Sequence, residues 1–480
     1  MTLDAVIVGA GPNGLAAAVE LARNGLDVLV LEAESTVGGS ARTEELTLPG
    51  FRHDVGSAVY PLGIASPFFS SLPLEEHGLE WVHPDVPLAH PLDGQRAALL
   101  KRGLDETAAD LRGDEASYRG LVSPFCRRWD AFRRHVLDAP TRIPRSPLLM
   151  LRFGLLAMRS TPSLADRFRT QEARALLAGN AAHAGIPLER PLASAVGLTL
   201  MVAGHTVGWP FARGGAGSIT AALASLLRSL GGKIETDSRV TSLSDLPAAR
   251  ATLLALTHQQ VAELAEDPLP TGGRLPAGYR DMLRTWEYGP GAFKLDWALD
   301  GPIPWTDAEV ARAGTVHLGG TLEEIALAER APWKGTVADR PFVLLAQPSL
   351  FDPTRAPEGK HVAWAYCHVP NGWTGDATTL IEAQVERYAP GFRDRILARS
   401  VLGTADLEGW NANLVGGDVN GGAFTLSQTF GPMRSALRPW GTPVDGLYVC
   451  SASRPPGGGV HGMAGYHAAR DALKRTFGLA

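Results

Sequence analysis

Cysteine is scarce in this chain, and the cysteines present are scattered. Cys126, Cys367 and Cys450 lie far apart among 480 residues, and no CxxC pair occurs. This spacing argues against a disulfide framework, a zinc ribbon and a dithiol redox centre. No apolar run approaches the about 18 residues of a membrane-spanning helix, and no basic leader precedes the first apolar segment. We therefore expect a soluble, cytoplasmic protein.

Positive charge is not in surplus. Lys and Arg number 45 against 50 Asp and Glu, a net charge of −5, and this balance disfavours nucleic acid as a partner. HExxH and HxH patterns are missing, which argues against a metal centre. No GxSxG stands between a strand and a helix, so a Ser-His-Asp hydrolase has no support.

The composition is that of a folded protein, with 45% hydrophobic and 20% charged residues. At about 150 residues per domain, the length predicts about three units or two interleaved ones. Glycine (54) and proline (35) are frequent but not periodic, which favours a loop-rich α/β or α+β fold.

The strongest motif lies in the first 43 residues. An apolar run, Ala5 to Val8, predicts a buried parallel strand, and GAGPNG and a small-residue helix follow it. A second predicted strand, Asp27 to Leu31, is followed by an acidic residue, Glu32. We expect the glycines to form a tight turn, admit a pyrophosphate and let helix and strand pack closely, while the acid binds a ribose. The alternative is a glycine turn without ligand. The predicted dinucleotide contacts are Gly9, Gly11, Pro12, Asn13, Gly14, Glu32 and Ala33.

A second glycine pair follows that acid. The stretch GAGPNGLAAAVELARNGLDVLVLEAESTVGGSART resembles the amino-terminal signature of FAD-dependent oxidoreductases of the amine oxidase and phytoene desaturase superfamily. The resemblance implies that the cofactor is FAD rather than NAD. It also implies that Gly38, Gly39, Ser40 and Arg42 approach the FAD pyrophosphate and ribityl chain.

The carboxyl-terminal segment resembles the same superfamily. Gly446 to Ser451 predicts a strand, and ASRPPGGGVHGMAGYHAARDAL follows with a helix beginning near Ala464. This segment is similar to the flavin motif of phytoene desaturases and retinol saturases, and the resemblance implies cofactor contacts from Ser451, Gly459, Val460 and Met463. Ser451 stands where the superfamily often has an acid, and its hydroxyl can still bind a ribityl hydroxyl.

A middle segment completes the predicted FAD domain. WPFARGGAGS, a helix and KIETDSRV resemble the superfamily's middle portion, in which the residue at Val240 touches adenine. We predict an α/β (α+β overall) fold with a Rossmann-type FAD-binding domain interleaved with a mixed-sheet and helical substrate domain. The FAD domain would comprise 1–70, 200–280 and 432–480, and the substrate domain with its helical lid would comprise 71–199 and 281–431.

One apolar stretch, residues 144–160, has arginines at both ends. It could lie in a membrane interface as a peripheral contact. The alternatives are a lid over an apolar substrate tunnel and ordinary core packing, and these are favoured because short apolar helices are usually buried.

Candidate catalytic residues are a lysine and two histidines. Lys294, eleven residues before Trp305, resembles the amine-oxidase lysine that reaches flavin N5 through a water; the alternative is a strand lysine that extends to solvent. His461 lies in the flavin motif and His205 precedes the middle segment, so either could act as acid or base. Both could equally be structural.

The leading hypothesis is an FAD-dependent oxidoreductase that passes a hydride between a C–C or C–N bond of an apolar small molecule and flavin N5. Oxygen or a quinone would accept the electrons. The first alternative is an amine oxidase releasing hydrogen peroxide, with an aromatic sandwich from Trp209, Trp305 or Tyr466. The others are a redox-neutral flavin isomerase and a non-enzymatic binder like the escort proteins of prenylated GTPases.

Overall fold

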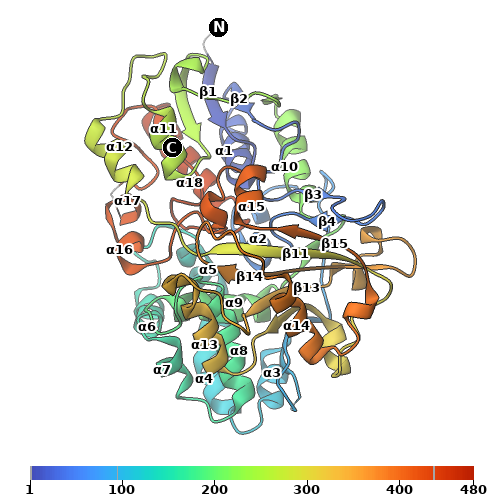
Figure 1. Ribbon diagram of the computed structural model, residues 1–480. Coiled ribbons are helices and arrows are strands. Elements are labelled where there is room, and N and C mark those ends of the chain that lie inside the picture. The colour runs from blue at the N-terminus through green and yellow to red at the C-terminus, as the bar shows by residue number, and fades with distance from the viewer. Residues whose placement is uncertain (1–2, 95, 436–437, 480) are drawn as a thin grey trace.

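The five-stranded sheet is parallel throughout and contains the amino-terminal strand. A computed structural model describes residues 3–94, 96–435 and 438–479 (Figure 1). The strand order is β16-β10-β1-β2-β9. The bounds are β1 Leu3–Val8, β2 Val28–Leu31, β9 Lys233–Glu235, β10 Ala249–Leu254 and β16 Leu447–Val449.

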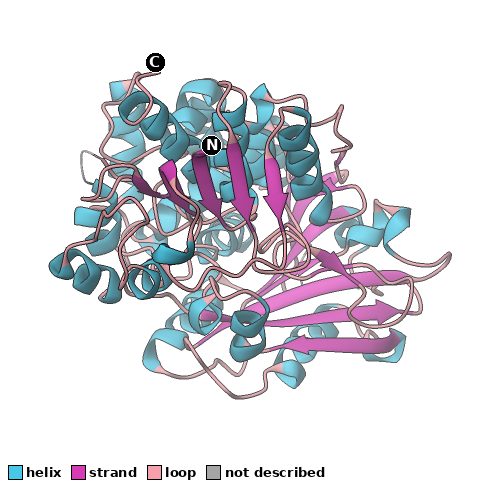
Figure 2. Cartoon of the chain, turned by 90° about the horizontal axis from the view of Figure 1, so that it is seen from above, coloured by secondary structure: helices cyan, strands magenta, loops and turns pink. Residues whose placement is uncertain are grey.

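Both faces of this sheet are covered by helices, which explains its uninterrupted apolar strands. Ala5 and Ile7 point toward one layer, while Val6 and Val8 point toward the other. The first layer contains α1 (Pro12–Ala22), α10 (Gly217–Ser229) and α18 (Met463–Arg475), and the second contains α11 (His258–Leu264) and α12 (Ala277–Arg284). Figure 2 shows the strands between these helices.

A seven-stranded mixed sheet forms the second part of the molecule. Its order is β15-β11-β14-β13-β12-β6-β7, and all neighbours are antiparallel except β12 and β6. Helix α14 (Thr378–Tyr388) packs on one face. The strand bounds are β6 Val86–His90, β7 Ala98–Leu100, β11 Gly291–Leu299, β12 Ala313–Leu318, β13 Val343–Ala346, β14 His361–Val369 and β15 Ile396–Leu402.

A helical layer packs beneath this sheet (Figure 1). Its helices are α3 Leu104–Asp110, α4 Glu115–Cys126, α5 Trp129–Val136, α6 Pro147–Ala157, α7 Thr161–Ala165, α8 Gln171–Ala182, α9 Ala193–Thr206 and α13 Leu322–Arg330. The remaining elements are α2 Pro61–Ala65, α15 Thr404–Trp410, α16 Leu426–Thr429, α17 Pro432–Ser435, β3 Thr43–Glu44, β4 His53–Asp54, β5 Trp81–Val82 and β8 Phe211–Ala212.

The predicted fold class is confirmed: a Rossmann-type parallel sheet is interleaved with a mixed sheet and a helical layer. The proposed domain boundaries stay a prediction, and one segment crosses them. Residues 404–421 leave the mixed sheet after β15 and contact Ser40, next to the second glycine pair, and Thr257, just after β10. Over the described ranges, no helix combines the length and apolarity that crossing a membrane requires.

Two helix-interior glycines provide a direct test of the close packing between α1 and α18. A Cβ on Gly465 would lie 1.8 Å from the Asn13 carbonyl oxygen, whereas one on Gly120 in α4 would meet nothing within 4 Å. We expect Gly465→Ala to destabilise the protein by about 2 kcal/mol or more. Gly120→Ala should be neutral or stabilising by up to about 1 kcal/mol. Urea unfolding measures both, and equal midpoints for the two variants would contradict this packing.

Candidate active site

The turn between β1 and α1 brings backbone atoms unusually close together. Gly9 has φ +98°, a conformation that favours glycine. A Cβ on Gly14 would lie 1.9 Å from the Gly9 carbonyl oxygen. The two glycines therefore let α1 begin directly above the carboxyl end of β1.

The amino terminus of α1 is open toward a cavity. No side chain caps it, and its first turn holds no acid. A Cβ on Gly11 would meet only the Gly39 Cα, at 3.6 Å, so the space beside this loop is free. Asn13 Oδ1 is buried with no hydrogen-bond partner in the described chain. Uncapped N–H groups at a helix start favour an anionic group such as a pyrophosphate.

The acid at the end of β2 is held in place by the backbone. Glu32 is 7% exposed. Its Oε2 accepts a hydrogen bond from the Ala10 N–H at 2.6 Å, and its Oε1 accepts one from the Glu34 N–H at 3.0 Å. The carboxylate therefore lies fixed beside the glycine loop, as ribose recognition requires.

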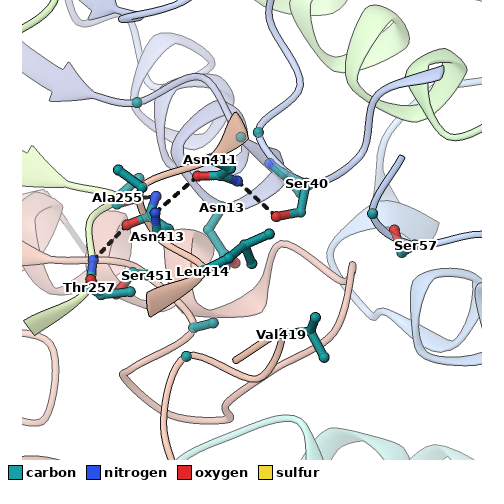
Figure 3. Close-up of a pocket in the computed structure, with 18 of the residues that line it drawn as sticks. Asn13, Ser40, Ser57, Ala255, Thr257, Asn411, Asn413, Leu414, Val419 and Ser451 are labelled. Atoms are coloured by element: carbon teal, nitrogen blue, oxygen red, sulfur yellow. Dashed lines mark hydrogen bonds between the residues drawn. The ribbon is translucent and has the colours of Figure 1, made fainter. Parts of the chain in front are cut away.

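The segment after β15 lies against the residues that follow the second glycine pair and those that follow β10 (Figure 3). Asn411 Nδ2 donates to Ser40 Oγ at 2.8 Å, and Asn413 Oδ1 accepts from the Thr257 N–H at 2.8 Å. The Arg42 guanidinium lies 4.1 Å from the centre of the Trp410 ring. These contacts close the nucleotide side of the cavity with residues from the far end of the chain.

The cavity beside the loop has a volume of about 800 Å³. It runs from the loop and Glu32 to the inner face of the mixed sheet, where its lining includes Lys294, Thr315, Trp364 and Tyr366. Thr315 Oγ1 and Trp364 Nε1 are buried without a hydrogen-bond partner among the described residues. Such atoms normally find a partner, so this end of the cavity fits a ligand with polar atoms.

A second cavity of about 510 Å³ adjoins the first. Helices α6 and α9 contribute mostly apolar residues, and Asp138 is the one Asp, Glu, Lys or Arg among the described lining residues. The two cavities share a wall made of Val59, Pro61, His183, Leu200, Asn420, Gly459 and Val460. A polar nucleotide space thus meets an apolar space at these residues.

Lys294 belongs to a buried charged network behind the first cavity. It is 2% exposed, so it does not extend to solvent, and its Nζ donates to Asp296 Oδ2. Asp296 Oδ1 lies 3.6 Å from His53 Nδ1. Burial lowers the pKa of Lys294, an effect that Asp296 opposes, and raises the pKa of Asp296 to about 6. Burial therefore disfavours the charged form of both groups, and their mutual attraction opposes this effect.

Comparison with known proteins agrees with this geometry. Residues 7–70 match the family model of an NAD(P)-binding Rossmann-like domain. Over 97% of the chain, it is 28% identical to the mouse (Mus musculus) pyridine nucleotide-disulfide oxidoreductase domain-containing protein 2, covering 92% of that protein. It is 26% identical to the phytoene dehydrogenase of Streptomyces griseus, over 90% of this chain and 87% of the relative.

A solved structure of putrescine oxidase bound to putrescine superposes with a TM-score of 0.61 at 16% identity, covering 99% of this chain and 100% of the other. That likeness concerns the fold. The chain thus contains a nucleotide-binding Rossmann-like unit and is similar over most of its length to proteins named as an oxidoreductase and a dehydrogenase. It is an enzyme, and the cavity beside its Rossmann loop is the candidate nucleotide site.

Most residues predicted to bind the cofactor of this oxidoreductase line the first cavity, together with the predicted catalytic Lys294. From the amino-terminal half they are Gly9, Gly11, Pro12, Asn13, Gly14, Glu32, Ala33, Gly39, Ser40, Arg42 and Val240, and from the carboxyl-terminal segment they are Ser451, Gly459 and Val460.

Four predicted residues are not in that lining. Gly38 shapes the loop, with its N–H donating to the Ala10 carbonyl at 3.0 Å. Met463 begins α18, and its N–H donates to His461 Nδ1 at 3.1 Å. His461 instead lines the second cavity. His205 is in the lining of neither cavity, and its Nε2 hydrogen-bonds with the Tyr118 hydroxyl at 2.7 Å.

Sequence reasoning missed the histidine at the junction of the two cavities. His183 lines both cavities, and its Nε2 lies 2.9 Å from Nε2 of His317. Burial lowers the pKa of His183 to about 3, so the imidazole is neutral. Its position at the end of α8, in a sequence without a motif, gave no signal of this role. Asn411 and Asn413 were also missed. They form the short pattern NAN in the sequence, but that pattern does not indicate a binding site by itself.

A substitution at Gly11 separates ligand binding from folding. Gly11 has an extended backbone, with φ −73°, that any residue adopts, and the added Cβ meets only an ordinary contact. We expect Gly11→Val to leave the urea midpoint within about 0.5 kcal/mol of the parent. The side chain would fill the space beside the loop, and bound flavin should fall below one tenth of the parent ratio. Flavin absorbance per protein measures this, and a variant that keeps its flavin would refute the loop assignment.

Buried neutral histidines should make this oxidoreductase sensitive to acid. The pKa of each of these histidines lies below its value of about 6.5 in the unfolded chain, so between those two values the unfolded chain binds more protons than the folded one. Their contribution to the free energy of unfolding is therefore fully present above pH 6.5 and is lost as the pH falls toward 4. Each group contributes up to about 1.4 kcal/mol per pH unit. Burial lowers the pKa of His53 and His183 to about 3 and that of His90, His205 and His461 to about 4.

Urea midpoints at pH 7.5, 6.5 and 5.5 measure this loss. His90→Gln should reduce the dependence of stability on pH by about one proton, because glutamine does not titrate in this range. The variant should still fold, since the glutamine amide can donate to the Gly320 carbonyl that His90 Nε2 contacts at 2.8 Å. Midpoints that do not change over this range would show that folding does not lower the pKa values of these histidines.

Proposed function

We propose that this chain is an FAD-dependent oxidoreductase that transfers a hydride between a carbon atom of a C–C or C–N bond in an apolar small molecule and flavin N5. The observation that carries the proposal is the shared wall between the nucleotide cavity and the apolar cavity. A substrate in the second cavity would meet the first at this wall, which includes His183 and Val460.

The first cavity fits FAD in its donor set and its free space. The α1 amino terminus and Gly11 would hold the pyrophosphate, Glu32 the adenosine ribose and Val240 the adenine. Ser40, Arg42 and Ser451 would hold the ribityl chain. Bound FAD would supply the hydride acceptor, and the electrons would pass to oxygen or a quinone.

The chain's own residues would orient the substrate and control protons. Lys294, paired with Asp296 and shielded from solvent, would hold a proton at the cavity wall. His183, neutral at the junction, would offer one imidazole nitrogen to the substrate while the other faces His317. The apolar lining of the second cavity excludes water from the reacting bond.

An amine oxidase remains the second candidate because Trp209, Trp364 and Tyr366 line the first cavity. Trp305 and Tyr466, the other predicted sandwich residues, lie elsewhere: Trp305 donates to Gln347 and Tyr466 stacks on Phe68. Trp364 and Tyr366 meet at 71° rather than facing each other in parallel. The apolar second cavity favours an apolar substrate over a cationic amine. A redox-neutral isomerase and an escort-type binder would differ by needing no net oxidant and no flavin, respectively.

The cofactor is tested by the visible spectrum of the purified protein and by identification of the compound that heat releases. We expect FAD at about one per chain. Anaerobic mixing with apolar alkenes and alcohols, compared with alkylamines, then ranks the two oxidoreductase candidates by flavin bleaching. A colourless protein that takes up no added FAD would leave the escort-type binder.

Lys294→Met tests the proposed proton-holding group. We expect flavin content to persist while flavin reduction or re-oxidation slows by about tenfold or more. Lys360→Met is the matched control, because that lysine pairs with Asp300 at the surface. Rapid-mixing rates for both variants decide the question: rates for Lys294→Met that match those of Lys360→Met would remove Lys294 from the reaction.

A further inference from the structure

Helix α6 presents one apolar face to solvent and another to the second cavity. Leu148, Leu151 and Leu155 recur at helical spacing and are 80%, 61% and 65% exposed. On the opposite face Met150 and Ala157 line the cavity. A helix that is apolar on both sides needs a partner for its outer face.

Residues around the helix extend this surface. Ile143 before α6 and Met158 after it are 95% and 49% exposed. Met158 also lines the second cavity, as does Phe430, which is 50% exposed. The outer apolar surface is therefore continuous with the rim of that cavity. Figure 1 shows α6 at the edge of the helical layer, away from the five-stranded sheet.

The charged residues between Asp138 and Asp166 in the sequence are all arginines. Arg142, Arg145, Arg152 and Arg159 lie in or beside the helix, and no acid occurs between Asp138 and Asp166. Arg142 pairs with Asp138 at 3.1 Å, while the other three make no ion pair within the described chain. Burial, and to a smaller degree the nearby Arg159 and Arg152, lowers the pKa of Arg167, so several cations lie near one another at this end of the molecule despite the net charge of −5.

We propose that the face formed by Ile143, Leu148, Leu151, Leu155 and Met158 docks on an anionic lipid surface and opens the second cavity to it. Exposed leucines flanked by arginines match the boundary between acyl chains and anionic headgroups. A second copy of the chain fits this face poorly, since the same arginines would meet one another. An apolar substrate would then enter from the lipid without crossing water, a step that rests on the proposed function.

The test is flotation of the flavin-loaded protein with vesicles of phosphatidylcholine alone or with one third phosphatidylglycerol, at about 0.15 M salt. We expect binding to the anionic vesicles. Leu148→Ser/Leu151→Ser/Leu155→Ser should weaken it by at least about tenfold. Arg145→Ala/Arg152→Ala/Arg159→Ala should remove the preference for anionic lipid.

Leu327→Ser is the matched control, because Leu327 on α13 is 61% exposed and lies outside this face; it should bind like the parent. Parent protein that stays unbound, or a leucine variant that floats as well as Leu327→Ser, would overturn the proposal. A concentration-dependent dimer that the leucine variant abolishes, without lipid binding by the parent, would assign the face to a second copy. Flavin content in the same samples separates this outcome from failure of the proposed function.

Discussion

The nucleotide site depends on backbone contact at the start of α1. Gly14 lies against the Gly9 carbonyl, and Gly465 of α18 lies against the carbonyl of Asn13. Neither Gly14 nor Gly465 has room for a side chain. The close approach therefore fixes how β1, α1 and α18 pack against one another. Because α1 begins above the carboxyl end of β1, its uncapped N–H groups face the cavity. Glu32, held by the Ala10 N–H, lies beside them for the same reason.

The interleaved chain brings two kinds of cavity together. The parallel sheet and the mixed sheet are each built from segments distant in sequence, and residues 404–421 pass from the second to the first. Asn411 and Asn413 tie that segment to Ser40 and Thr257. The polar cavity beside the glycine loop and the apolar cavity under α6 share a wall that includes His183 and Val460.

The main energetic cost of this arrangement is the lost hydration of buried charged groups, Lys294 and Asp296. Lys294 and Asp296 stand on the inner face of β11, and His53 approaches them from β4. A buried ion pair contributes little net stability because both groups lose their hydration. Its retention at the cavity wall fits a group that must hold a proton, which a hydrophobic pair of the same volume would not do.

The sequence by itself determined the Rossmann unit, since strand, glycines, helix and acid follow one another within 32 residues and local sterics dictate their arrangement. It also indicated Lys294, Ser451 and Val460 through resemblance. Only the tertiary structure decided that His183 stands between two cavities, that His205 faces Tyr118 and that α6 is apolar on both faces. These depend on contacts between segments tens to hundreds of residues apart, which no local pattern encodes.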